Sequence, residues 1–187
     1  MKIRYLGHSC IELFGKDHIL IDPNFDVKPR GDIDFICVTH EHQDHFDFEK
    51  FKSLSGELLA PRTVLEMYSL SGRKIRAGMR IANLEIHESH CFRALESYSF
   101  LVKDEKRLLH SGDSAKLPDV KADIIFSACF PSNYKDYLRE FKRLKPELVI
   151  PIHYKREKIE DALGLVEELK KVKINSKILK VSEYFEV

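Results

Sequence analysis

The sequence contains no tryptophan and only one glutamine, Gln43, among its 187 residues. Charged residues, in contrast, make up 33% of the chain. A shortage of thermolabile amides together with many charges is typical of thermophilic proteins, in which networks of ion pairs take over part of the stabilisation. The composition therefore favours a heat-stable protein.

Long apolar runs and an excess of charge of one sign are also missing. No apolar run approaches the ~20 residues that a membrane-spanning helix needs. The 31 basic residues nearly balance the 30 acidic ones, so no large net field would attract the protein to nucleic acid or to anionic lipid. We therefore expect a small-molecule substrate and neither a nucleic acid nor a membrane as partner. The composition predicts no particular oligomeric state.

The cysteines form no CxxC pair and lie far apart in the chain. Three of the four are in apolar, strand-like runs, which is typical of buried, reduced thiols. The cysteines are Cys10, Cys37, Cys91 and Cys129. The N-terminal segment Met1–Tyr5 enters strand-like sequence directly and lacks the apolar stretch and cleavage site of a signal peptide. We therefore expect a cytoplasmic protein.

The chain contains no internal repeat, no low-complexity tract and no Gly/Ser linker. Its 187 residues, 43% of them apolar, suffice for one hydrophobic core. We therefore expect one domain over residues 1–187.

The first third of the sequence predicts short strands and one helix. Three strands of an antiparallel meander, separated by glycine-containing turns, are expected at Lys2–Leu6, Cys10–Phe14 and His18–Asp22. The nearly continuous apolar run Ile33–Thr39 is typical of a strand covered on both faces. A helix is expected from its N-cap, Asp47, to about Leu54.

The rest of the sequence predicts further strands and two amphipathic helices. Strands are expected at Leu84–His90, Tyr98–Val102, Arg107–His110, Asp123–Ala128, Glu147–Ile152 and Lys177–Val181. Apolar residues recur at helical spacing from Tyr134 to Leu144 and from Ile159 to Leu169. Strands first, and then strands alternating with helices, favour sheets covered by helices on the outside.

The segment that directly follows the apolar run Ile33–Thr39 carries four potential metal ligands within six residues: His40, His42, Asp44 and His45. Imidazole nitrogens suit zinc and its neighbours, and a carboxylate adds an oxygen donor. A loop that leaves a buried strand is held by a rigid scaffold and is open to solvent. The segment therefore predicts a metal site rather than a polar loop with incidental histidines.

Four further motifs occur in order with this HxHxDH segment. They are Ile19–Pro23, His90 at the end of an expected strand, the GD[ST] element within Ser111–Ser114, and Pro151–Tyr154. Together the five motifs resemble the metallo-β-lactamase superfamily over essentially the whole chain. The resemblance implies an α+β fold, an αββα sandwich of two packed mixed sheets with helices on the outer faces.

The resemblance also implies two divalent ions and seven ligands. The first ion would be bound by His40, His42 and His90, and the second by Asp44, His45 and His153. Asp113 would bind both ions. Two ions ~3.5–4 Å apart activate a bridging water by lowering its pKa to near 7. Zinc is the expected metal, and manganese or iron would also suit these donors. Asp22 is expected to orient a ligand histidine by a hydrogen bond.

His87, Cys91 and His8 lie close to the metal motifs in the sequence or in the expected fold, but none of them is an expected metal ligand. His87 lies three residues before His90, so strand alternation would turn it to the opposite face, and we do not expect it to be a ligand. The same alternation would turn Cys91 away from the site, as a buried structural thiol. His8 lies in a Gly-His-Ser turn that relatives place near the metals, so it would support a ligand or contact the substrate.

The identity of two ligands and the length of the chain exclude several branches of the superfamily. Asp113 stands where common zinc β-lactamases have a cysteine, and His42 where di-iron flavoprotein reductases have a carboxylate. The segment after His153 is too short for the helical domain of glyoxalase II-type thioesterases, and no inserted domain or basic arm of the nucleic-acid-cutting branches is evident. The chain most resembles the compact branch around ascorbate-6-phosphate lactonase.

We therefore expect a hydrolase that cleaves a small, anionic ester, lactone or phosphodiester, with Asp44 moving the proton of the attacking water. Arg93, Lys116 and Lys155 follow the metal motifs closely and are candidates to contact the anion. The loops 24–32 and 116–121 would border the site. A phosphodiesterase acting on nucleotides or lipids and a non-catalytic metal-binding sensor or partner module are the alternatives.

Overall fold

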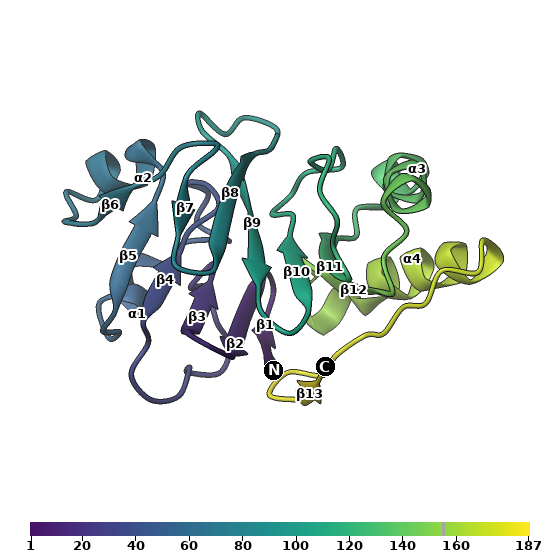
Figure 1. The fold of residues 1–187 in the computed structure, drawn as a ribbon, viewed down its shortest axis with the longest axis horizontal. Helices are drawn as coiled ribbons and strands as arrows, with labels where there is room; N and C mark the ends of the chain where they lie inside the picture. The colour runs from purple at the N-terminus through teal and green to yellow at the C-terminus, as the bar shows by residue number, and fades with distance from the viewer. Residues whose placement is uncertain (155) are drawn as a thin grey trace.

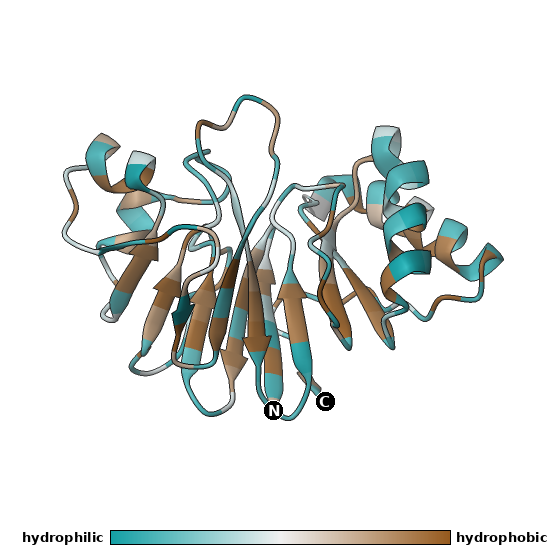
Figure 2. Cartoon of the chain, turned by 45° about the horizontal axis from the view of Figure 1, so that its top comes forward, coloured by the Kyte–Doolittle hydropathy of each residue, from teal (hydrophilic) through white to brown (hydrophobic). Residues whose placement is uncertain are grey.

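The computed structural model describes residues 1–154 and 156–187. Two β-sheets pack face to face, and the helices gather at the two sides of the pair (Figure 1). The strands consist largely of apolar residues, whereas the helices contain many polar ones (Figure 2). This arrangement confirms the predicted α+β sandwich.

The first sheet contains seven strands among the described residues. In spatial order they are β13 (Tyr184–Glu186), β1 (Lys2–Gly7), β2 (Cys10–Phe14), β3 (His18–Ile21), β4 (Phe35–Cys37), β5 (Glu57–Ala60) and β6 (Arg73–Lys74). The strands from β13 to β3 pair antiparallel, and those from β3 to β6 pair parallel. The predicted meander is thus extended by a parallel half.

The second sheet contains six strands among the described residues. In spatial order they are β12 (Leu148–Ile152), β11 (Ile124–Ala128), β10 (Arg107–His110), β9 (Tyr98–Lys103), β8 (Leu84–Glu88) and β7 (Arg80–Ile81). The strands from β7 to β10 pair antiparallel, and β10, β11 and β12 pair parallel. Both sheets are therefore mixed.

The helices cover the outer faces. They are α1 (Phe48–Phe51), α2 (Arg62–Met67), the 3-10 helix η1 (Pro131–Asn133), α3 (Tyr134–Leu144), the 3-10 helix η2 (Arg156–Lys158) and α4 (Ile159–Lys171). In Figure 1, α1 and α2 lie beside β4 to β6, whereas α3 and α4 lie beside β11 and β12. Among the described residues, no helix combines the length and the apolar character that crossing a bilayer requires.

Strand alternation divides the core into two apolar clusters. On β3, Ile19 and Ile21 join the cluster that includes residues of the second sheet, whereas Leu20 joins the cluster that includes Val64 of α2. Successive side chains of a strand point to opposite faces, so the first sheet is buried on both. That burial explains the nearly continuous apolar run into β4.

Two predicted elements differ most from the structure. Residues 177–181 form no strand: Ser176 makes a single bridge to Val149, Leu179 packs into the core, and the last strand is β13. The helix after Asp47 is only one turn long, although the Asp47 carboxylate accepts the predicted cap bond from Lys50 N at 3.1 Å. Apolar alternation alone does not distinguish a paired strand from an extended segment packed on the core.

Candidate metal centre

Six of the seven predicted ligands, all except His90, converge where several strands end. The HxHxDH segment follows β4, Asp113 follows β10, and His153 follows β12 directly. The loops leaving these strands bring side chains from both sheets to one place, which explains why residues more than a hundred positions apart can share a site.

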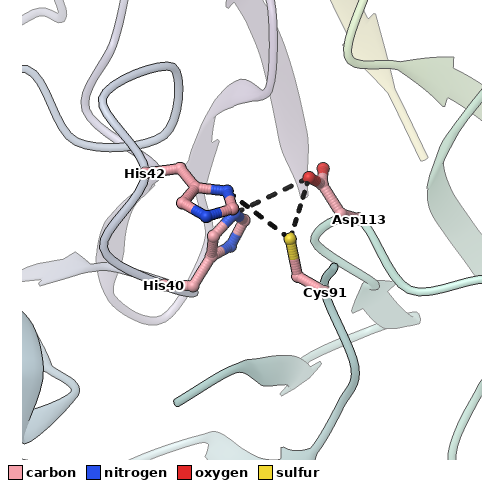
Figure 3. A group of neighbouring side chains, drawn as sticks. All are labelled: His40, His42, Cys91 and Asp113. Carbon is pink, nitrogen blue, oxygen red and sulfur yellow. Dashed lines mark hydrogen bonds and ion pairs between the residues drawn. The ribbon is translucent and has the colours of Figure 1, made fainter. Parts of the chain in front are cut away.

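The first group of potential ligands consists of His40, His42, Cys91 and Asp113 (Figure 3). Each offers one donor atom, and the four atoms lie within 4.8 Å of one another. Asp113 Oδ2 is 3.6 Å from His40 Nε2 and 3.4 Å from Cys91 Sγ. Cys91 Sγ is also 3.6 Å from His42 Nδ1. Two imidazoles, a thiol and a carboxylate thus surround one point.

The second group shares Asp113 with the first. Asp113 Oδ1 lies 2.9 Å from His45 Nε2 and 3.2 Å from His153 Nε2. Asp44 Oδ2 is 3.2 Å from the same His153 nitrogen, and His8 joins Asp44 and His153 in an overlapping group. The two carboxylate oxygens of Asp113 therefore face two neighbouring groups.

Buried polar atoms without hydrogen bonds mark the centre of both groups. Within the described part of the chain, no hydrogen bond reaches His40 Nε2, His45 Nε2, His153 Nε2 or Asp113 Oδ1, although some of these atoms approach one another closely. Burying a polar atom without a partner is costly. A cation bound among these nitrogen and oxygen donors would remove that cost, so the donor set fits divalent metal ions.

Asp22 holds the ligand His45 in place by a hydrogen bond. The Asp22 Oδ2 atom accepts a 2.6 Å hydrogen bond from His45 Nδ1, and Thr39 donates its N–H to Oδ1 (2.8 Å) and its hydroxyl to Oδ2 (3.0 Å). With Nδ1 donating to Asp22, His45 directs Nε2 into the site, as a ligand histidine requires. The structure thus places Asp22 where the sequence analysis expected a ligand-orienting carboxylate.

The charges of the site favour a cation at its centre. Burial acts to lower the pKa of His45, but the carboxylates of Asp22 and Asp113 outweigh it and raise the value to about 10. Burial also acts to raise the pKa of Asp113, but the neighbouring His45 holds it well below its usual range. Burial, with His45 adding to it, lowers the pKa of His40 to about 3. The carboxylates are therefore ionised, and His40 is neutral and able to bind a metal.

The sequence analysis expected His90 in the metal site and Cys91 turned away from it, and the structure shows the reverse. The His90 side chain is exposed and belongs to neither group, although it borders the adjacent cavity. Cys91 is only 6% exposed and has its sulfur in the first group. The prediction that Cys91 points away is wrong, because β8 ends at Glu88 and strand alternation no longer applies beyond it.

His8 and the other histidines are also located. The His8 ring lies 4.3 Å from the His153 ring, and burial lowers the pKa of His8 to about 4, so it is neutral. His87 stays on β8, outside both groups, where Nε2 is 3.9 Å from Glu85. His110 is buried beneath the Asp113 turn, where its Nδ1 accepts from Gly112 N at 3.2 Å.

A cavity of about 750 Å³ opens beside the two groups. Its walls combine ligand side chains with apolar and basic ones, among them His42, Asp44, Phe92, Lys116, Phe130 and Arg139. Lys116 is thus at the cavity as predicted, whereas Arg93 is not among the lining residues and its guanidinium lies 5.0 Å from the Phe92 ring. Lys155 lies outside the described residues. Arg139 was not predicted, because it appears in the sequence only as one of several charges on α3.

The fold and the site together define a class. The chain belongs to the beta-lactamase superfamily: the model of the beta-lactamase superfamily domain matches residues 2–153. The chain is 26% identical to a UPF0173 metal-dependent hydrolase of Nanoarchaeum equitans, over 82% of this chain and 84% of that protein. It is 28% identical to a UPF0173 protein of Pyrococcus furiosus over the full length of both.

A solved structure shows the same fold. The metallo-beta-lactamase fold protein YhfI from Bacillus subtilis superimposes with a TM-score of 0.79 at 15% sequence identity, covering 100% of this chain and 98% of that one.

Proposed function

We propose that the protein is a metal-dependent hydrolase with a binuclear centre. The observation that carries this proposal is the sharing of Asp113 by two groups of donor atoms, one with His40 and His42 and the other with His45 and His153. The name of the Nanoarchaeum equitans relative, a metal-dependent hydrolase, supports the same reaction class.

The side chains of the two groups would hold two divalent ions, with Asp44 at the second. Bound there, the ions would supply a nucleophilic water at neutral pH and polarise the group under attack. Zinc suits the imidazole-rich donor set best, and manganese or iron are the alternatives.

Side chains of the protein would accept and transfer the proton of the attacking water. The Asp44 side chain is 46% exposed at the cavity, and its Oδ2 lies 3.2 Å from His153 Nε2. The neighbouring His153 holds the pKa of Asp44 well below its usual range. An ionised, accessible carboxylate at this point can accept a proton from the attacking water and pass it to the leaving group. Neutral His8 would orient His153 or the substrate.

The substrate would be small and anionic. Lys116 and Arg139 bring positive charge to the lining of the cavity, where Asp136 pairs with Arg139 at 2.8 Å, and Phe92 and Phe130 provide apolar contact. An ester, a lactone or a phosphodiester meets these requirements. Four free cysteines among the described residues fit a reducing, cytoplasmic location.

A substrate panel tests the proposal. The protein, loaded with Zn²⁺ or Mn²⁺, is assayed with simple lactones, a thioester and bis-p-nitrophenyl phosphate. Turnover of one class that requires the metal and Asp113 supports hydrolysis and identifies the bond. Selective cleavage of the phosphodiester would favour a phosphodiesterase. Two bound metals without any turnover would favour a metal-binding sensor instead.

A further inference from the structure

The loop after β8 presents Cys91, and not His90, to the first group of donor atoms. The Cys91 sulfur lies 3.6 Å from His42 Nδ1 and 3.4 Å from Asp113 Oδ2, and Figure 3 shows it directed at both. The thiol is 6% exposed, whereas the His90 imidazole is at the surface. The sulfur therefore occupies the place where a third protein ligand would be needed beside the two imidazoles.

This position of Cys91 is fixed from both sides. Before it, His90 N donates to Ser114 Oγ at 3.3 Å, which ties the loop to the turn that carries Asp113. After it, Leu95 N donates to Glu41 Oε1 at 2.6 Å, and Glu41 lies between the ligands His40 and His42. The loop is thus anchored to the two segments that carry the other three members of the group.

A second observation points independently to a bound ion at the same place. His40 is fully buried, and its Nε2 makes no hydrogen bond among the described residues. This nitrogen faces Asp113 Oδ2 at 3.6 Å, the oxygen that also faces the Cys91 sulfur. A cation among these atoms would have a nitrogen, a carboxylate oxygen and a sulfur within reach.

We propose that Cys91, as a thiolate, is a ligand of the first metal ion in place of His90. This inference rests on the proposed binuclear function and deepens it. On binding, the S–H bond breaks, the sulfur electron pair forms the bond to the metal, and the proton leaves to solvent. The first site is then His40, His42, Cys91 and Asp113, and the His90 imidazole stays at the wall of the cavity.

The thiolate would make the two metal sites unequal. Thiolate is a soft ligand that favours zinc and cobalt over manganese, whereas the second group contains only imidazole and carboxylate. The first site would therefore select zinc more strongly than the second. The negative charge of the thiolate would also weaken the Lewis acidity of the ion in the first site.

Cobalt substitution is the test, because a thiolate bound to Co²⁺ gives an intense charge-transfer absorption in the near ultraviolet that imidazole and carboxylate do not give. The purified protein is freed of metal, loaded with two equivalents of Co²⁺, and its absorption spectrum is recorded. We expect the band in the wild-type protein and in His90→Ala, and its loss in Cys91→Ser. Cys129→Ser is the matched control, since that buried thiol donates to Ile152 O and takes no part in the site.

Zinc X-ray absorption on the wild-type protein gives a readout that needs no variant. A sulfur at ~2.3 Å from zinc is expected. Bound cobalt without the band, a band that persists in Cys91→Ser, or a zinc shell without sulfur would overturn the thiolate ligand and leave the binuclear hydrolase standing. Failure of the protein to bind either metal would overturn both proposals.

Discussion

Asp113 is the residue on which both halves of the site depend, because its two oxygens face different groups. Asp113→Ala should therefore impair both metal sites, and elemental analysis should find fewer than two ions per chain together with a loss of hydrolysis. His87→Ala is the matched control, because that histidine lies on β8 outside both groups, and its metal content should be unchanged. Loss of metal from His87→Ala but not from Asp113→Ala would contradict the assignment.

Asp22 acts through His45 and not by touching the metal. Asp22→Asn would keep the size of the side chain but remove the charge that holds His45 Nδ1–H at 2.6 Å. Partners that orient ligand histidines typically contribute about 10–100-fold to metal affinity or activity, and a loss of that size is expected in a metal titration. Glu49→Gln, at an exposed carboxylate on α1, should bind metal like the wild type. Equal affinities of Asp22→Asn and Glu49→Gln would exclude the orienting role.

At the scale of single residues, a site residue can be predicted from the sequence when its neighbours in the chain determine its position. His40 to His45 could be found because they follow a run apolar enough to be a buried strand. Cys91 could not be placed, because alternation gives the side-chain direction only up to the last paired residue, and the end of β8 is set by its pairing with β9. Arg139 could not be recognised either, because only the packing of α3 brings it to the cavity.

At the scale of elements, a buried ion network joins β1, β2 and β3. Glu12 is fully buried and accepts from Arg4 Nη1 (2.9 Å) and Arg30 N (2.6 Å), while His18 Nε2 lies 3.1 Å away. Removing one partner of a buried ion pair costs about 3–5 kcal/mol. Glu12→Ala should therefore lower the free energy of urea unfolding by about that amount. A loss well below 1 kcal/mol would show that Arg4 finds other partners.

The same network predicts that the stability of the fold decreases both at low pH, through Glu12, and at high pH, through His18. Burial raises the pKa of Glu12, but hydrogen bonds led by that of His18 outweigh it, so the pKa lies below its ordinary 4.5. This contribution to stability is present above pH 4.5 and is lost as the pH falls through the lowered pKa. Burial lowers the pKa of His18, but the bond to Glu12 outweighs it and raises the pKa above 6.5. That contribution is present below pH 6.5 and is lost as the pH rises through the raised pKa.

Urea unfolding of the wild type over a pH series should therefore show the full contribution of this network between pH 4.5 and 6.5, the two ordinary values. Glu12→Gln should flatten both decreases, because an amide cannot titrate or attract the imidazolium. Parallel curves for the two proteins would mean that other groups cause the pH dependence.

Elements with strong local signals were predicted better than those that depend on pairing partners. The strands at 2–6 and 10–14 and the helix from Tyr134 to Leu144 agree closely with β1, β2 and α3. The short strands β6 and β7 and helix α2 were not predicted, because two or six residues carry too little periodicity. Segment 177–181 shows the opposite error, because this strand-like sequence meets the edge strand β12 only at its start, where Lys177 N donates to Val149 O at 3.0 Å.

At the scale of the whole molecule, metal binding should stabilise the fold, because the site exists only when both sheets are in place. A ligand present at 100 times its dissociation constant stabilises the folded state by about 2.7 kcal/mol. For a chain of this size, that corresponds to a fall in Tm of roughly 5–10 °C when a chelator removes the metal. Scanning calorimetry with and without chelator measures the shift. The Asp113→Ala variant should show little response to the chelator.

The order of the strands along the chain separates the two sheets. Apart from β13, the first sheet is complete at β6, and the second begins at β7. A single backbone cut between Lys74 and Arg80 would therefore leave His40, His42, Asp44 and His45 on one fragment and Cys91, Asp113 and His153 on the other. In such a nicked protein, each metal ion would bridge two polypeptides, and adding zinc would favour their reassembly.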